Sequence, residues 1–347
     1  MTVSEDFAGI TVRFRSELLA HCYRMLGSAE EAEDLVQETY LRAWRSYDGF
    51  EGRSSVRTWL YRIATNVCLT ALERRGRRPL PSGLGAPADD PQAPLVAGTD
   101  VPWLQPLPGV MLTGDWQDPG DLAVSRASIR LAYVAALQNL SARQRAVLIL
   151  RDVLEWPAAE VAELLDTTTT AVNSGLRRAR AQLALALPAE DELAEPAEPD
   201  RKALLERFAA AVQDADESAL AHLLRADVVL EMPPTLTWFV GRWTVARFAG
   251  ERLLTEPGRL RVVPVTANGQ DGFAVYAREP DGEWHAHALQ VLTVTATGIA
   301  RIVAFTDVRL FGLFGLPRRF PDGRLVCIGA PPNGRRLEGS TQTTESE

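Results

Sequence analysis

The chain has 347 residues, of which 46% are hydrophobic and 24% are charged, and its formal net charge is −8. The length predicts two or three domains, and the composition is that of an ordinary soluble protein. No apolar run approaches the roughly 18 residues of a membrane span and no signal peptide is recognisable, which excludes a membrane protein and predicts a cytoplasmic one. Cys22, Cys68 and Cys327 lack any zinc-ligand spacing, so we expect buried thiols and neither metal nor cofactor.

The charge is unevenly distributed along the chain. Residues 1–52 hold 5 Arg and 10 acidic residues, whereas residues 53–78 hold 7 Arg and a single acid. A second basic stretch, 167–187, has three Arg and no acid, while residues 79–124 and 188–200 contain six acids each and no base. Two basic patches that are separated and flanked by acidic tracts are typical of a protein that binds nucleic acid at two sites.

The first part of the chain, up to Arg78, has a helical pattern. Ser28 with Glu31 forms the capping box of one helix, and another helix follows the Gly-Arg-Ser-Ser sequence at 52–55. From Pro79 to Gly120 the chain is rich in proline, glycine and aspartate without a sustained period, which predicts a linker that lacks its own core.

The linker nevertheless contains large apolar residues, Trp103, Leu104 and Leu107. A passive tether rarely needs such residues. We therefore expect that the linker lies in a groove of a partner, with a collapsed surface loop as the alternative.

Residues 137–183 have a helix-turn-helix pattern. A helix over Trp156–Leu165 is followed by a turn at Asp166–Thr168 and a second helix that Thr168 caps. The outer face of the second helix carries polar and basic residues, namely Thr169, Asn173, Ser174, Arg177 and Arg178. Because asparagine pairs with adenine, and arginine with guanine or phosphate, this face predicts a helix that reads a major groove. An arginine-decorated, solvated helix is the alternative.

A different fold begins near residue 201, after the acidic, proline-bearing boundary. Apolar residues at helical spacing come first, and strand-like runs that begin at Leu260, Phe273, Trp284 and Ile299 follow them. Helices first and meandering strands afterwards predict an α+β domain with a curved antiparallel sheet. We expect the tail after Ala330 to be disordered.

Two segments, Asp34–Trp44 and Ser54–Asn66, resemble the core-binding and promoter-melting segments of extracytoplasmic-function sigma factors of bacterial RNA polymerase. Residues 101–106, 140–154, 231–234 and 287–293 further resemble an actinobacterial subgroup of this family that carries a fused C-terminal SnoaL-like domain. The resemblance implies a multidomain protein with two all-α units and an α+β cone. The expected order along the chain is sigma region 2 at 1–78, a linker at 79–124, sigma region 4 at 125–187, a second linker at 188–200, the SnoaL-like domain at 201–330 and the tail at 331–347.

The resemblance implies two partners, the RNA polymerase core, through its β′ clamp and β subunits, and promoter DNA. Asp34, Gln37 and Glu38 share one helix face and are expected to contact the core, with a solvated acidic stripe as the alternative. The expected minus-10 contacts are a base-capturing pocket and a basic flank, at Phe50, Arg62, Asn66, Arg74, Arg75, Arg77 and Arg78. Phe50 as an ordinary core residue is the alternative.

Region 4 is expected to read the minus-35 element through the outer face of its second helix. The subgroup usually has alanine where Gly175 stands, and the glycine is expected to destabilise this helix by about 1 kcal/mol. The acidic linker resembles the segment that such factors thread toward the active-site and RNA-exit channel of the polymerase.

For the C-terminal domain the resemblance implies a cone-shaped pocket, a fold shared by enzymes and by non-catalytic modules. His285 and His287 alternate with Leu289 and Val291, which predicts that both imidazoles point into the cone. The expected lining is Glu231, Trp238, Tyr276, His285, His287 and Asp307. These residues would perform proton transfer, bind a small-molecule ligand, or only satisfy one another.

The sequence thus predicts a non-enzymatic transcription initiation factor. By resemblance, its C-terminal domain packs on the two DNA-binding units and shifts the balance between a closed and a polymerase-competent state. A bifunctional protein with an enzymatic pocket is one alternative. A plain DNA-binding repressor is another, and the acidic helix at 34–38 argues against it.

Overall fold

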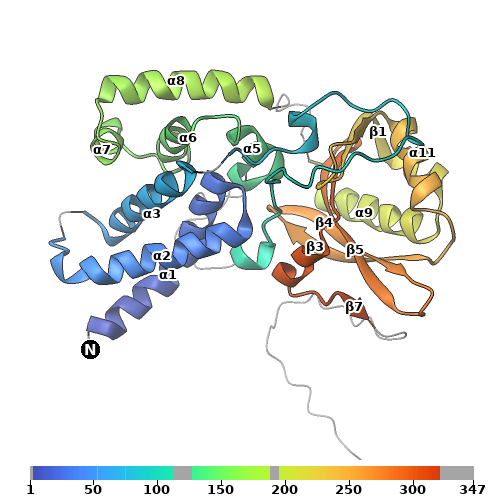
Figure 1. Ribbon diagram of the computed structural model, residues 1–347, viewed down its shortest axis with the longest axis horizontal. Coiled ribbons are helices and arrows are strands. Elements are labelled where there is room, and N and C mark those ends of the chain that lie inside the picture. The colour runs from blue at the N-terminus through green and yellow to red at the C-terminus, as the bar shows by residue number, and fades with distance from the viewer. Residues whose placement is uncertain (1–2, 53, 75, 113–126, 188–194, 321–347) are drawn as a thin grey trace, which may run out of the picture.

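The computed structural model describes residues 3–52, 54–74, 76–112, 127–187 and 195–320. Helices form the N-terminal half of the molecule, and a mixed sheet with covering helices forms the C-terminal half (Figure 1). The predicted tail, Arg75 and Cys327 lie outside the described residues. In the described part of the chain, no helix combines the length and the apolar character that crossing a membrane requires.

Three helices form the first unit, namely α1 (Val3–Leu26), α2 (Ala29–Ser46) and α3 (Val56–Leu72). The predicted helix starts are confirmed, because the side chain of Ser28 accepts the N–H of Glu31 and that of Ser55 accepts the N–H of Thr58. The Glu31 carboxylate forms an ion pair of 2.7 Å with Arg78. This ion pair fixes the start of the linker beside α2.

The second unit is also helical. Its elements are α5 (Leu131–Leu137), α6 (Ala142–Leu148), a π-helical segment (Ile149–Val153), α7 (Ala158–Leu164) and α8 (Thr169–Ala186). The helix-turn-helix prediction is confirmed in α7 and α8. Thr168 Oγ1 accepts the N–H of Ala171 at 3.1 Å, and Val172, Leu176 and Ala179 are buried against the preceding helices.

The C-terminal domain is the predicted α+β fold. Its helices are α9 (Glu198–Gln213), α10 (Glu217–Leu223) and α11 (Arg242–Arg252). Its strands are β1 (Leu224–Glu231), β2 (Trp238–Val240), β3 (Leu260–Ala267), β4 (Gln270–Arg278), β5 (Trp284–Thr295), β6 (Gly298–Phe305) and β7 (Arg319–Phe320). Helix α9 begins inside the segment expected to be a linker.

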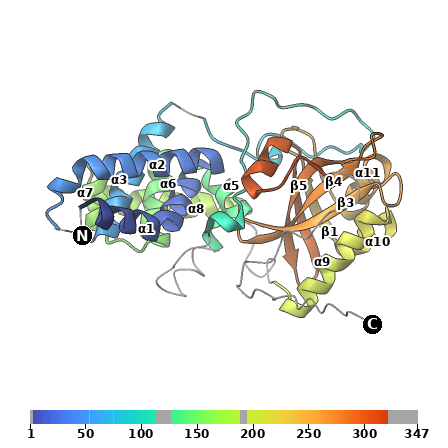
Figure 2. The same cartoon turned by 90° about the horizontal axis from the view of Figure 1, so that it is seen from below.

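The sheet has the order β2-β1-β6-β5-β4-β3, with β7 added beside β5. The expectation of a purely antiparallel sheet is wrong at one pair, because β1 pairs with β6 in parallel. Strand β1 enters the sheet directly from α10 instead of by a hairpin, and the long connection from β1 to β6 allows parallel pairing. Residues of α9, α10 and α11 pack on one face of the sheet (Figure 2).

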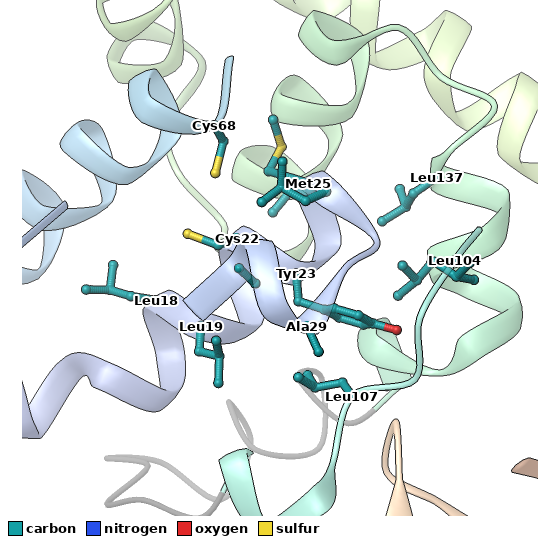
Figure 3. Packing of buried hydrophobic residues seen from close by; sticks show 14 of the residues in the cluster. Leu18, Leu19, Cys22, Tyr23, Met25, Ala29, Cys68, Leu104, Leu107 and Leu137 are labelled. Carbon is teal, nitrogen blue, oxygen red and sulfur yellow. The ribbon is translucent and has the colours of Figure 1, made fainter. Parts of the chain in front are cut away.

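The other face of the sheet carries a 3-10 helix, Val308–Phe314. The hydrophobic core on this face is continuous with the core of the helical half. Leu104 and Leu107 of the linker are fully buried in this shared core, beside Tyr23 and Leu137 (Figure 3). In this arrangement these residues therefore lie in a core of the chain itself, in contrast to the expected groove of a partner. They are buried between units of the same chain because the sheet and α1 together cover them.

The linker also runs along the C-terminal domain (Figure 1). The N–H of Ala88 donates to the carbonyl of Trp238 at 2.8 Å, and the N–H of Gly98 donates to that of Pro234 at 2.8 Å. The Arg252 guanidinium donates to three consecutive linker carbonyls, those of residues 91–93. The C-terminal domain thus holds the linker largely through hydrogen bonds to the linker's main chain.

Candidate nucleic-acid interface and interdomain contacts

The outer face of α2 combines acidic and apolar side chains. Asp34 and Gln37 are exposed, and the half-exposed Glu38 forms an ion pair of 2.7 Å with Arg42. Leu41 and Trp44, which sequence reasoning missed, are 52% and 47% exposed and follow Asp34 and Gln37 at seven-residue spacing, which places them on the same side. Their signal was present, because both are large apolar residues outside the buried stripe of α2.

The predicted minus-10 residues lie on α3 and in the segments that flank it. The rings of Phe50 and Trp59 are 4.9 Å apart, and Phe50 is half-buried. Trp59, Arg62 and Asn66 are spaced i, i+3 and i+7, so they share one face of the helix over about 10 Å. Asn66 is exposed on this face, and Arg74 is exposed just beyond the end of α3.

Arg62 is engaged by the helix-turn-helix unit. Its Nη1 donates to Glu163 Oε1 of α7 at 3.0 Å, and its Nη2 donates to Glu163 Oε2 at 3.3 Å. The hydrogen bonds from Arg62 lower the pKa of Glu163. The Glu163 carboxylate of the second unit thus pairs with the Arg62 guanidinium, which was predicted to bind the DNA backbone.

Two other cations of this basic patch also have contacts within the chain. Arg77 donates to Asn139 Oδ1 at 3.2 Å, and Arg78 forms the ion pair with Glu31. The patch that the sequence predicts to be a DNA contact is therefore partly occupied by protein groups in this arrangement.

The outer face of α8 is open to solvent. Thr169, Asn173, Arg177 and Arg178 are exposed, and Ser174 is half-exposed. Helix α8 lies along one edge of the helical half (Figure 1). Because this face is accessible while Arg62 is engaged, the two predicted DNA-binding surfaces differ in their availability.

The residues predicted to line the C-terminal pocket have partners within the chain. Glu231 is fully buried, forms an ion pair with Arg301 and accepts the N–H of Ser82 in the linker at 2.9 Å. The Trp238 indole N–H donates to a linker carbonyl, that of Gly85, at 3.1 Å. The Tyr276 hydroxyl donates to the carbonyl of Pro317 at 3.0 Å, and Asp307 pairs with Arg309.

The prediction that His285 and His287 share a strand face with Leu289 and Val291 is wrong. Val275 pairs with Ala288 and Tyr276 with Ala286, so β5 has a bulge at His287. The bulge reverses the alternation, and consequently Ala286 packs in the same cluster as Leu289 and Val291.

The two histidines have different surroundings. The Nε2 of His285 lies 2.8 Å from an Asp281 carboxylate oxygen in the turn before β5. Burial, and secondarily the charge of Arg259, lowers the pKa of His287. The structure therefore does not join them in one acid-base pair.

A hairpin of the C-terminal domain joins the two helical units. The turn between β3 and β4 consists of Asn268 and Gly269, at φ values of 56° and 66°, as a two-residue hairpin requires. Asn268 is fully buried. Its Nδ2 donates to the Tyr23 hydroxyl and to the carbonyl of Ile129, both at 2.7 Å, and it exchanges two hydrogen bonds with the main chain of Leu107.

Further contacts extend this hairpin junction. Gln270 Oε1 accepts the N–H of Leu131 at the start of α5, and its Nε2 donates to the carbonyl of Leu292 in β5. One hairpin thereby contacts α1, the linker and α5. Sequence reasoning missed Asn268, because an Asn-Gly turn predicts a hairpin and says nothing about what docks on it.

Comparison with known proteins identifies the two helical units. The family models for Sigma-70 region 2 and Sigma-70 region 4 match residues 11–78 and 130–183. The chain is 51% identical over 315 residues to the ECF RNA polymerase sigma factor SigG of Mycobacterium tuberculosis, with 90% of this chain and 84% of SigG covered. It is 29% identical over 179 residues to the ECF RNA polymerase sigma factor SigW of Bacillus subtilis, with 52% and 87% covered.

Among solved structures, the extracytoplasmic function sigma factor SigJ of Mycobacterium tuberculosis has a similar fold. The superposition covers 91% of this chain and all of SigJ, with a TM-score of 0.57 and 23% identity. It includes both the helical units and the C-terminal α+β domain. Together with the two matched regions and the extended identity to SigG, this similarity shows that the chain belongs to the extracytoplasmic-function family of RNA polymerase sigma factors.

Proposed function

We propose that this sigma factor binds core RNA polymerase through the outer face of α2 and is held in a closed state by its own C-terminal domain. The observation that carries the second part is the buried Asn268 of the β3–β4 hairpin, because it joins the C-terminal domain to Tyr23, Leu107 and Ile129 of the helical half and the linker. In the same arrangement, the pairing of Arg62 with Glu163 joins the two predicted DNA-binding units. We use region 2 for residues 1–78 and region 4 for residues 125–187.

The docking surface on α2 consists of Asp34, Gln37, Glu38, Leu41 and Trp44. Exposed apolar side chains beside acidic ones suit an interface with an apolar centre and a charged rim. The acidic residues would orient α2 on a basic surface of the β′ clamp, and Leu41 and Trp44 would supply the buried area. The Arg42 side chain would exchange its ion pair with Glu38 for solvent.

The closed arrangement does not suit simultaneous promoter contacts by regions 2 and 4. The minus-10 and minus-35 elements are about 25 base pairs apart, which is about 85 Å at roughly 3.4 Å per base pair. Here α3 of region 2 touches α7 of region 4 directly. The two units must separate to contact both elements, and Arg62 is then released to bind the DNA backbone.

The C-terminal domain favours the closed state because its β3–β4 hairpin contacts region 2, the linker and region 4 at once. The linker would have to leave its position along the C-terminal domain in order to enter the polymerase channel. A short connection between region 4 and α9 gives the docked domain an effective concentration in the millimolar range, so a modest interface is sufficient.

No small-molecule ligand or catalytic step belongs to this proposal. The pocket residues predicted from the sequence, Glu231 and Tyr276 among them, have hydrogen-bond partners within the chain. The C-terminal domain acts here through its contacts with the rest of the chain.

Run-off transcription with purified core polymerase and candidate promoters tests the proposal, with the full chain compared with a chain that ends at Leu187. Both forms are expected to direct transcription, and the shorter form is expected to be the more active. A full chain that outperforms the shorter form would overturn the inhibitory role. The absence of both core binding and transcription in either form would overturn the assignment of the docking surface.

A further inference from the structure

Helix α8 contains a glycine that no contact within the described chain requires. Gly175 lies in the middle of Thr169–Ala186, where glycine is less favourable than alanine because it lowers helix stability. A Cβ atom added at this position would meet no heavy atom within 4 Å of it, apart from its own helix backbone and chain neighbours. Steric crowding inside the protein therefore does not explain the missing side chain.

Gly175, whose own backbone is buried, instead lines a hollow on the side of α8. The hollow has a volume of about 420 Å³ and lies between α6, the helix-turn-helix turn and α8. The hollow has an apolar floor, formed by Val147, Leu165 and Val172. Its rim carries two arginines and two hydroxyl-bearing residues, namely Arg143, Arg178, Ser141 and Thr167. Arg143 is fixed there by a hydrogen bond of 2.6 Å from its Nη2 to the carbonyl of Leu165.

The lining favours an anionic occupant. Of the ten lining residues that the structure describes, two are arginines and none is acidic. All ten come from residues 141–178, so the C-terminal domain contributes nothing to the hollow. Five of the lining residues are exposed, so an external ligand has access from solvent: Ser141, Arg143, Thr167, Ala171 and Arg178.

The position of the hollow identifies the kind of ligand. Ala171, Gly175 and Arg178 form a stripe beside Ser174 on α8, and they flank the exposed face of Asn173 and Arg177. A helix whose exposed face reads base edges in the major groove has the sugar-phosphate backbone at its flank. Deoxyribose carbons match the apolar floor, and a phosphate matches the arginines at the rim.

We propose that the Gly175 hollow receives one strand of the backbone of duplex DNA, and that the glycine permits a closer approach of that strand than any side chain would. The inference rests on the proposed role of region 4 in reading the minus-35 element. It adds a backbone-binding site, with Gly175, Arg143 and Arg178 as positioning residues, next to the residues that read bases. Gly175 thus contributes to DNA affinity by leaving space.

The test uses the full chain with core polymerase and a double-stranded promoter fragment that supports run-off transcription. Gly175→Ala adds a single methyl group, and Gly9→Ala in α1 is the matched control, because the Cβ at Gly9 also meets nothing within 4 Å. Both variants are expected to raise the melting temperature. Gly175→Ala alone is expected to weaken promoter binding roughly tenfold, which corresponds to about 1.4 kcal/mol.

A second readout is the salt dependence of promoter binding. Loss of one phosphate contact lowers the slope of log affinity against log salt concentration by about one, so Gly175→Ala should have a shallower slope than Gly9→Ala. Equal affinities and slopes for the two variants would overturn the proposal. A Gly175→Ala variant that loses core-polymerase affinity and keeps its DNA affinity would also overturn it, because the occupant would then be a protein segment. If wild type binds core and no promoter DNA, the proposed function itself fails.

Discussion

The side chain of Asn268 is expected to hold the C-terminal domain on the helical units, and Asn268→Gly isolates its contribution. Glycine adopts the positive φ of this turn without strain, so the substitution removes the amide and leaves the hairpin intact. The N–H of Leu107 and the carbonyl of Ile129 then lose their Asn268 partners, while both residues are buried. The Tyr23 hydroxyl still donates to the carbonyl of Gln105 at 2.7 Å.

Each unsatisfied buried polar group costs about 1–3 kcal/mol, so we expect the docked state to lose about 2–6 kcal/mol for the two groups. Undocking exposes both groups to water, and the closed-to-open equilibrium should therefore shift by between roughly 30-fold and 20,000-fold. Chemical denaturation of the full chain measures the first quantity. Run-off transcription with core polymerase measures the second, and Asn268→Gly should be the more active form.

Ala215→Gly is the matched control, because Ala215 also has a positive φ, in the turn between α9 and α10. This control should not lower stability or change transcription. Unchanged stability of Asn268→Gly, together with unchanged hydrogen exchange of the Leu107 amide, would refute the hydrogen-bond argument. Lowered stability with unchanged transcription would refute the link between docking and activity.

Glu163→Gln should increase promoter-complex formation at low salt, because it releases Arg62 of α3. The free energy of unfolding should not change measurably, because an exposed ion pair contributes little stability. Glu160→Gln is the control, and equal promoter binding by the two variants would contradict the idea that Glu163 blocks the DNA-binding face of α3. Asp34→Arg combined with Glu38→Arg should abolish binding to core polymerase and leave the melting curve normal, because exposed charges rarely contribute to stability. Core binding at wild-type affinity would show that α2 is not the docking surface. Burial, and secondarily the charge of Arg24, lowers the pKa of His21 from 6.5 to about 3, so the folded state disfavours its protonation. Stability should therefore be full above about pH 6.5 and fall by about 1.4 kcal/mol per pH unit as the pH drops toward 3. The variant His21→Gln should lack this part of the slope, and an identical pH profile would rule out His21 as its source.

The local elements of this protein were predictable because each is encoded by neighbouring residues. Ser28, Ser55 and Thr168 cap the helices that the sequence predicts, and the four strand-like runs form strands β3 to β6. Capping and periodicity depend on residues a few positions apart, so a single sequence contains the necessary information. The family motifs in region 2 and region 4 are of the same local kind.

The contacts that join these elements were decided only by the tertiary structure. Asn268 and Tyr23 are 245 residues apart, and Arg62 and Glu163 are 101 residues apart, so no local pattern indicates either pairing. The bulge at His287 similarly depends on how β5 pairs with β4, and one additional residue reversed the expected orientation of the neighbouring side chains. The sequence by itself determined helices, strands and family, because these follow from local spacing and composition. The closed arrangement arose only when the shared core and the Asn268 hairpin brought distant segments together, since the burial of apolar surface is non-directional and does not specify partners along the chain.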